Sequence, residues 1–371
     1  MKTCSRIFQV LGLLLCLSFE TQAQNDPLPV RNDTAINISS RIMPENRTVW
    51  IHLPADYYTT DNTYPVLYLL DGDSHFDYGA RMADFLAGHD RNRIPEMIVV
   101  GIVNVDRQRD FSPDAGRSRF SRYLEEEVVA YVDAHYRVQP YRILAAHSLA
   151  GLVALSTKET KPALFSATIL TSPVTNPELL QHIGACFSGS HPHNGQMFVG
   201  IGNENTAAVD ALLKELKQHA PAWFKYAHAN YPGENHFTVP YKTLFDGLKF
   251  IYRDWFIDFY GKQVLTQPGL VKHFEKLSAD FGYTITPTED FLNSCGYYEL
   301  GFKRSGNAIA IFAENARRHP GSANAYDSLG EAFMAAGNKP DAIRNYKRSL
   351  ELNPHNDNGK QMLEKLEHIK P

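Results

Sequence analysis

Five continuous apolar runs constrain the fold of this chain more than any other feature. They lie in the stretches YPVLYLLDGD, EMIVVGIVNVD, YRILAAHS, FSATILTSP and QMFVGIGNEN. A run of this kind is typical of a strand that is buried on both faces of a sheet. Segments with the apolar spacing of amphipathic helices follow several of the runs. Strands that alternate with helices predict a mostly parallel α/β sheet, with its ligand site at the carboxyl ends of the strands.

The chain begins with the pattern of a signal peptide over residues 1–23. Basic Lys2 and Arg6 precede an apolar stretch, Ile7–Phe19, and small residues follow it. A membrane anchor is the alternative, but the apolar stretch is too short to span a bilayer comfortably. We therefore expect cleavage of this segment, a periplasmic or secreted protein, and no integral membrane span afterwards.

Export would leave two cysteines in the mature chain, Cys186 and Cys295. Two cysteines could form a single disulfide in an oxidising compartment, but they do not make a disulfide framework. We expect two unpaired, partly buried thiols.

The charge balance excludes one large class of partners. The 371 residues carry a formal net charge of −4, with a pI of about 6.4. Nucleic acid and anionic membranes are therefore not expected as partners. A zinc site formed by His182, His191 and His193 is not expected either, because no HExxH or paired-cysteine spacing accompanies them. We expect neither a metal nor a cofactor.

The C-terminal part of the sequence repeats with a period of 34 residues. The matching pairs are Gly296 and Gly330, Ala308 and Ala342, Phe312 and Tyr346, and Pro320 and Pro354. This period and its small and aromatic positions resemble the tetratricopeptide repeat. We expect a catalytic domain over residues 24–262, a connector over 263–287 and helical repeats over 288–371. Such repeats offer a surface for a protein partner or for self-association.

Ser148 is the candidate nucleophile. It follows an apolar run, and the small residues Ala146, Ala150 and Gly151 surround it. A nucleophile elbow has the pattern G-x-S-x-G, because bulk next to the serine would strike the neighbouring strand and helix. Here alanines replace both glycines. The alternative is an ordinary helix start, since serine is a preferred N-cap residue.

A nucleophilic serine needs a base and an acid, which in an α/β sheet of this type follow in the order Ser, acid, His. His236 lies in the loop YPGENHF after the last predicted strand. Glu204 follows the run MFVGIGN and should lie at the carboxyl edge of the sheet. Asp210 is the alternative acid, although it falls within the next predicted helix.

An acyl-transfer reaction also needs two backbone donors for the oxyanion. One candidate is the amide of Leu149, the residue after the proposed nucleophile. The other is the amide of Asp73, in the DGDSHF segment after the first apolar run. The alternative for this segment is a simple turn.

Two further residues are candidates for substrate contacts, Arg107 and His147. Arg107 lies with Arg109 in the segment NVDRQRDFSP, at the same predicted edge of the sheet. Either guanidinium could bind a carboxylate or a phenolic oxygen of a substrate. The alternative is an internal ion pair with Asp106 or Asp110 that anchors the loop.

Four stretches together resemble the putative-esterase family of α/β-hydrolases. They read YPVLYLLDGDSHF, IPEMIVVGIVNVDRQRDFSP, YRILAAHSLAGLVAL and GENHFTVPYKTLFDGLKFIY, and the likeness covers about Ile36 to Trp255. This family includes enterobactin-type siderophore esterases, S-formylglutathione hydrolase, feruloyl esterases and mycolyl transferases. The chain is most similar to exported bacterial members with a C-terminal tetratricopeptide tail.

The resemblance implies an α/β-hydrolase fold with a mostly parallel central sheet and a small all-α C-terminal domain. It implies Ser148 as nucleophile, His236 as general base, and Leu149 and Asp73 as oxyanion donors. We expect an exported serine esterase that hydrolyses a small-molecule carboxylic ester through an acyl-enzyme. Two alternatives stay open: an acyltransferase to a sugar or lipid hydroxyl, and a catalytically inactive hydrolase fold that acts as a binding module.

Overall fold

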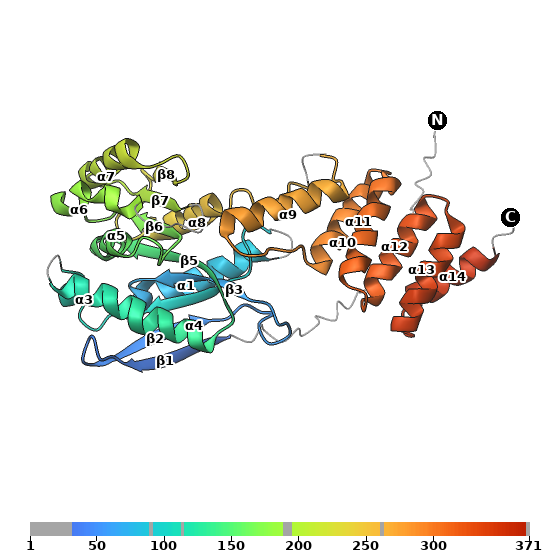
Figure 1. Cartoon of the computed structure of the whole chain (residues 1–371), viewed down its shortest axis with the longest axis horizontal. Helices are drawn as coiled ribbons and strands as arrows, with labels where there is room; N and C mark the ends of the chain where they lie inside the picture. The colour runs from blue at the N-terminus through green and yellow to red at the C-terminus, as the bar shows by residue number, and fades with distance from the viewer. Residues whose placement is uncertain (1–31, 89–91, 113–114, 188–194, 260–262, 369–371) are drawn as a thin grey trace, which may run out of the picture. The chain divides into compact units, whose positions relative to one another are not determined.

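The computed structural model describes residues 32–88, 92–112, 115–187, 195–259 and 263–368 (Figure 1). The predicted signal peptide lies outside these residues and stays a prediction. Within the described residues, no helix is long and apolar enough to cross a membrane.

An eight-stranded sheet forms the centre of the first part of the described chain, in the order β1-β2-β4-β3-β5-β6-β7-β8. The strands are β1 (Asp33–Ser39), β2 (Asn46–His52), β3 (Tyr64–Leu69), β4 (Ile98–Ile102), β5 (Val138–His147), β6 (Ala167–Thr171), β7 (Gln196–Ile201) and β8 (Lys225–Asn230). Only the β1–β2 and β2–β4 pairs are antiparallel. The pairs from β4 through β8 are parallel, so the predicted mostly parallel sheet is confirmed.

Helices cover both faces of the sheet. One face packs against α1 (Gly72–Ala87), α8 (Val239–Ile251) and α9 (Gln267–Phe281). The opposite face packs against helices that include α3 (Ala115–Tyr123), η1 (Leu124–Val129), α4 (Ala130–His135), α5 (Ala150–Thr160), α6 (Pro177–Gln181) and α7 (Ala207–His219). The short elements α2 (Arg107–Phe111) and η2 (Ile183–Phe187) complete this part. The five apolar runs are buried because both faces are covered.

Two elements differ from the expectation drawn from sequence. Strand β1 lies in what reads as a polar leader, where Ile36 and Ile38 alternate with polar residues at the edge of the sheet. The DGDSHF segment is the start of helix α1 rather than only a turn, with Asp71 as its N-cap. In both cases tertiary contacts decide the structure of a segment with weak local signals.

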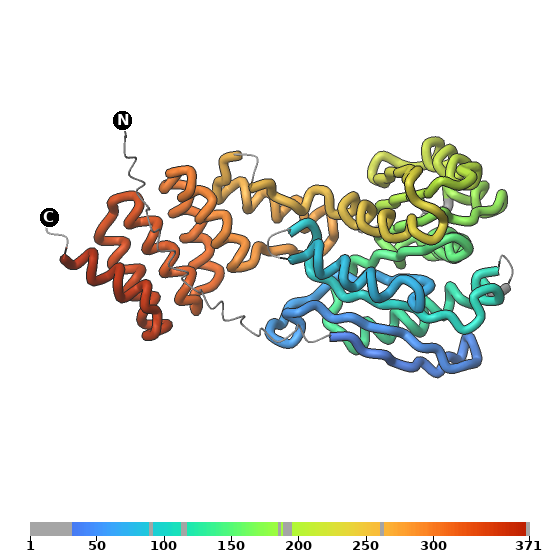
Figure 2. Tube along the Cα trace, turned by 180° about the vertical axis from the view of Figure 1, so that it is seen from behind, coloured from blue at the N-terminus to red at the C-terminus, as the bar shows by residue number. Residues whose placement is uncertain are grey.

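The C-terminal helices recur at the spacing seen in the sequence. They are α10 (Glu289–Gly301), α11 (Ser305–Arg318), α12 (Ala323–Ala335), α13 (Lys339–Leu352) and α14 (Asp357–His368). The first residues of α10, α12 and α14 lie 34 positions apart, and Figure 2 shows the helices stacked side by side. The all-helical C-terminal region is confirmed, while its assignment to tetratricopeptide repeats stays a prediction.

The small residues of the repeat lie where two helices approach closely. A Cβ added at Gly296 would come within 2.4 Å of the Phe312 ring, and one at Gly330 within 3.1 Å of the Tyr346 ring.

Of the two cysteines expected in the mature chain, Cys295 is buried and free. The side chain of Cys186 lies outside the described residues.

The predicted connector, residues 263–287, contains helix α9. Three of its apolar side chains, Phe274, Leu277 and Phe281, belong to the same buried cluster as α1 and α8. Lys276 of this helix also bonds Asp254, at 2.7 Å. The segment therefore packs along the sheet region rather than only linking two parts.

The registers of the parallel strands place their carboxyl ends at one edge of the sheet. Leu69 pairs with Ala145, His147 with Thr171, and Thr171 with Gly200. The residues that come directly after β3, β5, β6 and β7 are therefore neighbours, although they are widely separated in sequence.

Candidate active site

Ser148 occupies a sharp turn between β5 and α5. Its φ is 58°, in the left-handed region that a residue with a Cβ rarely adopts. Two backbone hydrogen bonds of 2.9 Å hold the turn: the Ser148 amide donates to the Thr171 carbonyl, and the Val174 amide donates to the Ser148 carbonyl. The N-cap of α5 is Leu149. The helix N-cap interpretation therefore does not describe Ser148.

The small residues around Ser148 are packed tightly. Ala146 is 4% exposed and Ala150 is fully buried. A Cβ added at Gly151 would lie 2.7 Å from the Cβ of Pro173, closer than real atoms approach. The two alanines are therefore accommodated, while the glycine that follows them leaves no space for a side chain.

His236 and Glu204 are joined by a short hydrogen bond. His236 Nδ1 lies 2.7 Å from Glu204 Oε2. The exposed fraction of the side chain is 32% for His236 and 27% for Glu204. The loop that carries His236 is tied to the end of β7, because the Asn203 amide donates to the Glu234 carbonyl at 2.8 Å. Helix α8 begins directly after this loop and packs on the sheet, which fixes the loop from its other end.

Ser172 is a site residue that the sequence reasoning missed. It comes directly after β6, and its hydroxyl donates to Glu204 Oε1 at 2.5 Å. Partial burial raises the pKa of Glu204, but the hydrogen bonds from Ser172 and His236 outweigh burial and hold it below its usual value. A polar residue directly after a buried strand, at the same edge as Ser148, is the signal that could have identified Ser172.

The alternative acid, Asp210, lies elsewhere. Its side chain is exposed on α7 and accepts a hydrogen bond of 2.7 Å from the Thr206 hydroxyl. The structure thus brings Glu204, and not Asp210, to His236.

The imidazole of His236 lies next to the elbow. Its ring centroid is 4.6 Å from that of His147, the residue that precedes Ser148. Among the described residues, no hydrogen bond joins the Ser148 hydroxyl to His236. Catalytic hydrogen bonds of this kind are often long before a substrate binds.

His147 is buried rather than open to a substrate. It is 9% exposed and packs between the rings of His75 and His236. Burial, together with the neighbouring imidazoles of His75 and His236, lowers the pKa of His147 to about 4. Its ring is therefore neutral near neutral pH.

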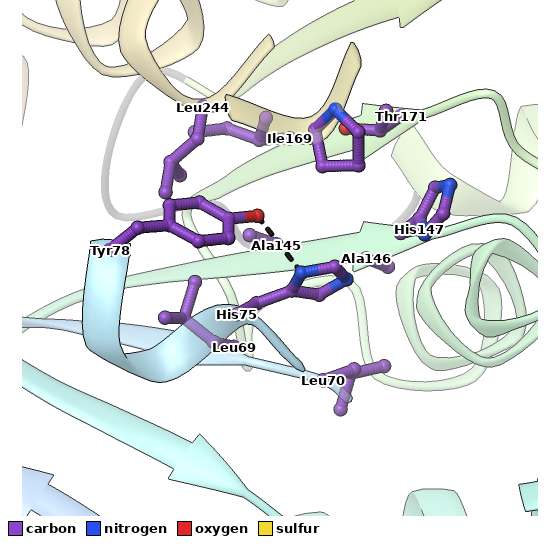
Figure 3. A pocket seen from close by; sticks show the side chains of 11 residues that line it. Leu69, Leu70, His75, Tyr78, Ala145, Ala146, His147, Ile169, Thr171 and Leu244 are labelled. Carbon is purple, nitrogen blue, oxygen red and sulfur yellow. Dashed lines mark hydrogen bonds between the residues drawn. The ribbon is translucent and has the colours of Figure 1, made fainter. Parts of the chain in front are cut away.

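A small cavity lies beside His147, on the side of α1 and α8 (Figure 3). Its volume of about 20 Å³ is enough for one water molecule. The wall is mostly apolar, and the Tyr78 hydroxyl and His75 Nδ1 are joined by a bond of 2.9 Å. The Nε2 atoms of His75 and His147 are buried without a partner among the described residues. Burial lowers the pKa of His75 as well.

The two predicted oxyanion donors both belong to the start of a helix. Asp73 lies in the first turn of α1, and Leu149 is the N-cap of α5. Amides at these positions have no partner within their own helix. Gly72 lets the first of these loops approach β4, because a Cβ there would lie 2.5 Å from the Gly101 carbonyl carbon.

The arginines of the NVDRQRDFSP segment are held in ion pairs. Arg107 donates to both carboxylate oxygens of Asp71, from Nε at 2.7 Å and from Nη2 at 3.0 Å. The same Nη2 donates to the His147 carbonyl at 3.1 Å. Arg109 pairs with Asp110 at 2.7 Å, as the ion-pair alternative predicts. For Arg107, the partner is Asp71 rather than either residue considered from sequence.

Within the described residues, no cluster of three or more metal-ligating side chains could hold a metal ion. His182 of the considered zinc site bonds Glu159 at 3.0 Å. His191 and His193 lie outside the described residues.

The fold and this edge of the sheet define an α/β-hydrolase. The sheet is mostly parallel, a serine with left-handed backbone geometry lies between a strand and a helix, and a loop after the last strand carries a histidine. The family model described as "Putative esterase" matches residues 40–230, just over half of the chain. The chain belongs to this esterase family.

Three known proteins are similar to this chain over different shares of its length. The IroE-like serine hydrolase of Shewanella oneidensis is 26% identical, with a TM-score of 0.67 over 77% of this chain and 99% of that one. An uncharacterised protein of Capnocytophaga ochracea is 15% identical, also with a TM-score of 0.67, over 90% and 99%. Its coverage shows the same fold extending into the helical region. The uncharacterized protein YbbA of Bacillus subtilis is 22% identical over 47% of this chain and 76% of its own.

The neutral, buried state of His147 predicts a pH dependence of stability. Its ordinary pKa is 6.5 and its folded pKa about 4, so the unfolded chain binds more protons between these values. The stabilisation is present above pH 6.5 and decreases as the pH falls towards 4. We expect the histidine to account for a loss of about 2 kcal/mol in unfolding free energy between pH 7 and 4.5.

Urea unfolding of the wild type and of His147→Gln across this range measures the effect, because the variant should lose part of the pH slope. His219→Gln is the control, since His219 is exposed on α7. Equal slopes for the wild type and His147→Gln would contradict the prediction.

Proposed function

We propose that the protein is an exported serine esterase that hydrolyses carboxylic esters of small molecules through an acyl-enzyme on Ser148. The observation that carries the proposal is the 2.7 Å contact between His236 and Glu204, next to a serine in a left-handed strand-to-helix turn. Membership of the esterase family supports an ester as the substrate class.

The reaction uses the residues in the following roles. His236 accepts the Ser148 proton as the hydroxyl oxygen attacks the ester carbonyl. Glu204 accepts from Nδ1 of the histidine, which fixes its tautomer and stabilises the imidazolium. The Leu149 and Asp73 amides stabilise the oxyanion.

Collapse of the tetrahedral intermediate breaks the bond to the alcohol, which takes a proton from His236. Water, deprotonated by the same imidazole, then attacks the acyl-enzyme and releases the acid. Ser172 holds the second oxygen of Glu204 and so keeps the acid in place.

Export rests on residues 1–23, with basic Lys2 and Arg6 and the apolar stretch Ile7–Phe19. The mature protein would then function in the periplasm or outside the cell. Mass spectrometry of protein from expressing cells should give an N-terminus near residue 24. A retained N-terminal Met1 in the exported fraction would contradict cleavage.

Ser148→Ala should abolish hydrolysis of p-nitrophenyl acetate, with a fall in kcat of at least about 10⁴-fold, because the variant lacks the hydroxyl that attacks the ester. A fluorophosphonate should label the wild type at Ser148, as shown by peptide mapping. Ser118→Ala, at an exposed serine on α3, is the control.

Product analysis with added glycerol distinguishes hydrolysis from acyl transfer. Free acid as the only product supports hydrolysis, whereas glyceryl ester as the main product supports acyl transfer. A folded protein that is neither labelled nor active would favour the binding-module alternative.

Glu204→Gln should lower kcat by about 10³-fold, because an amide can neither fix the required tautomer of His236 nor stabilise its protonated form. Asp210→Asn should leave kcat unchanged, since Asp210 is exposed and its carboxylate bonds the Thr206 hydroxyl at the start of its own helix. Steady-state kinetics of both variants on the same ester measure this. The reverse pattern would assign the acid to Asp210.

A further inference from the structure

The two proposed oxyanion donors come from separate segments, so something must fix their separation. The β3 and β5 segments are still bonded at Leu70, whose amide donates to the Ala145 carbonyl at 3.0 Å. Beyond this bond both chains turn sharply, with a φ of 55° at Asp71 and 58° at Ser148. The Asp73 and Leu149 amides follow these turns, beyond the last backbone bond of the ladder.

One side chain spans the gap between the two turns. The Arg107 guanidinium binds both carboxylate oxygens of Asp71 and also the carbonyl of His147. Its contacts therefore lie two residues before each proposed donor. The arginine belongs to neither segment, since it begins the short helix α2 after β4.

We propose that Asp71 and Arg107 form a brace that sets the spacing of the oxyanion hole, and that Arg107 is a positioning residue rather than a substrate ligand. This inference rests on the esterase function proposed above. Arg107 acts on the reaction through Asp71 and through the His147 carbonyl, without contacting the substrate.

The surroundings of Asp71 make the brace rigid. The carboxylate is 5% exposed and accepts a further bond of 2.6 Å from the Asn104 side chain. The same Asn104 amide also donates to the Asp73 carboxylate at 3.1 Å, which ties the residue that carries the donor to the brace. A buried carboxylate that accepts three hydrogen bonds from two side chains cannot change orientation without leaving a charge unpaired.

The brace also has an electrostatic role. Asp71 lies two residues from the Asp73 amide, and an unpaired carboxylate there would oppose the negative charge that develops on the substrate. The bidentate pair with Arg107 balances this carboxylate with a permanent positive charge. The backbone amides can then stabilise the oxyanion without competition from an unpaired carboxylate at Asp71.

A substrate clamp is the competing role for Arg107. The Arg107 side chain is 36% exposed, so it is not fully enclosed. However, its Nε and Nη2 are already bonded to Asp71 and to the His147 carbonyl, and its planar group packs over Phe111 at 5.5 Å. A carboxylate of a substrate would have to displace Asp71 to gain a bidentate contact of the same kind.

The test compares Arg107→Gln, Arg107→Lys and Asp71→Asn with the wild type on p-nitrophenyl acetate, a neutral ester with no carboxylate for an arginine to bind. The control is Arg122→Gln, which removes an equally bidentate pair with Glu126 on the exposed face of a helix. We expect kcat to fall about 10- to 100-fold in Arg107→Gln with KM within two-fold, less than the loss of a whole donor. Arg107→Lys keeps the charge but not the three contacts, so its loss should be intermediate.

A second measurement separates positioning from general damage to the fold. A trifluoromethyl ketone adds Ser148 to its carbonyl and places an oxyanion in the hole, so its affinity should fall by the same factor as kcat/KM. Melting temperature is measured in parallel, and if Arg107→Gln does not fold, the other two variants decide by the same measurements. In the double variant Asp71→Asn/Arg107→Gln, the two losses should not add, because either change alone removes the brace.

The outcomes are distinct. Undiminished kcat in folded Arg107→Gln, or a raised KM with unchanged kcat, would overturn the brace while leaving the esterase intact. Loss of kcat without loss of trifluoromethyl ketone affinity would also overturn it. A wild type without Ser148-dependent turnover would overturn the esterase proposal and the brace with it.

Discussion

The backbone at Ser148 passes from a buried strand into a buried helix with a φ of 58°, and the rest of the site is arranged around this turn. A left-handed residue with a Cβ is unfavourable by about 1–2 kcal/mol, so the surrounding structure has to hold it. The hydrogen bonds with Thr171 and Val174 do so from the neighbouring β6 segment. The same turn leaves no space for a side chain at Gly151, which lies against Pro173. Strain at the serine and small residues next to it thus have one cause.

Parallel strands explain how residues far apart in sequence come to share this edge. Ser148, Ser172 and Glu204 come just after β5, β6 and β7, and the registers of these strands bring their ends together. His236 is the exception, because it lies on a loop beyond β8. Two restraints compensate for this: the bond from Asn203 to the Glu234 carbonyl, and helix α8, which packs on the sheet. The imidazole is therefore held from both ends of its loop.

Features of the site that follow directly from a buried strand could be predicted from the sequence. The run before Ser148 and the run before Glu204 place both residues at the correct edge, and the loop after the last strand identifies His236. Partners chosen by tertiary structure could not be predicted in this way. Arg107 has aspartates next to it in sequence, yet it pairs with Asp71, 36 positions away. Strand β1 could not be predicted from the sequence for a related reason, since pairing with β2, rather than its own apolar content, makes it a strand.

Charge balance at the carboxyl edge connects the arrangement to the proposed chemistry. Three carboxylates lie at this edge: Asp71 is paired with the Arg107 guanidinium, Asp73 accepts a hydrogen bond from the Asn104 amide, and Glu204 bonds His236. His147 adds no charge, because burial keeps it neutral near neutral pH. A protonated ring there, 4.6 Å from His236, would oppose the imidazolium that forms during the reaction. Arg107 balances the Asp71 carboxylate and His147 stays neutral, so neither adds a net charge beside the backbone amides that would stabilise the oxyanion.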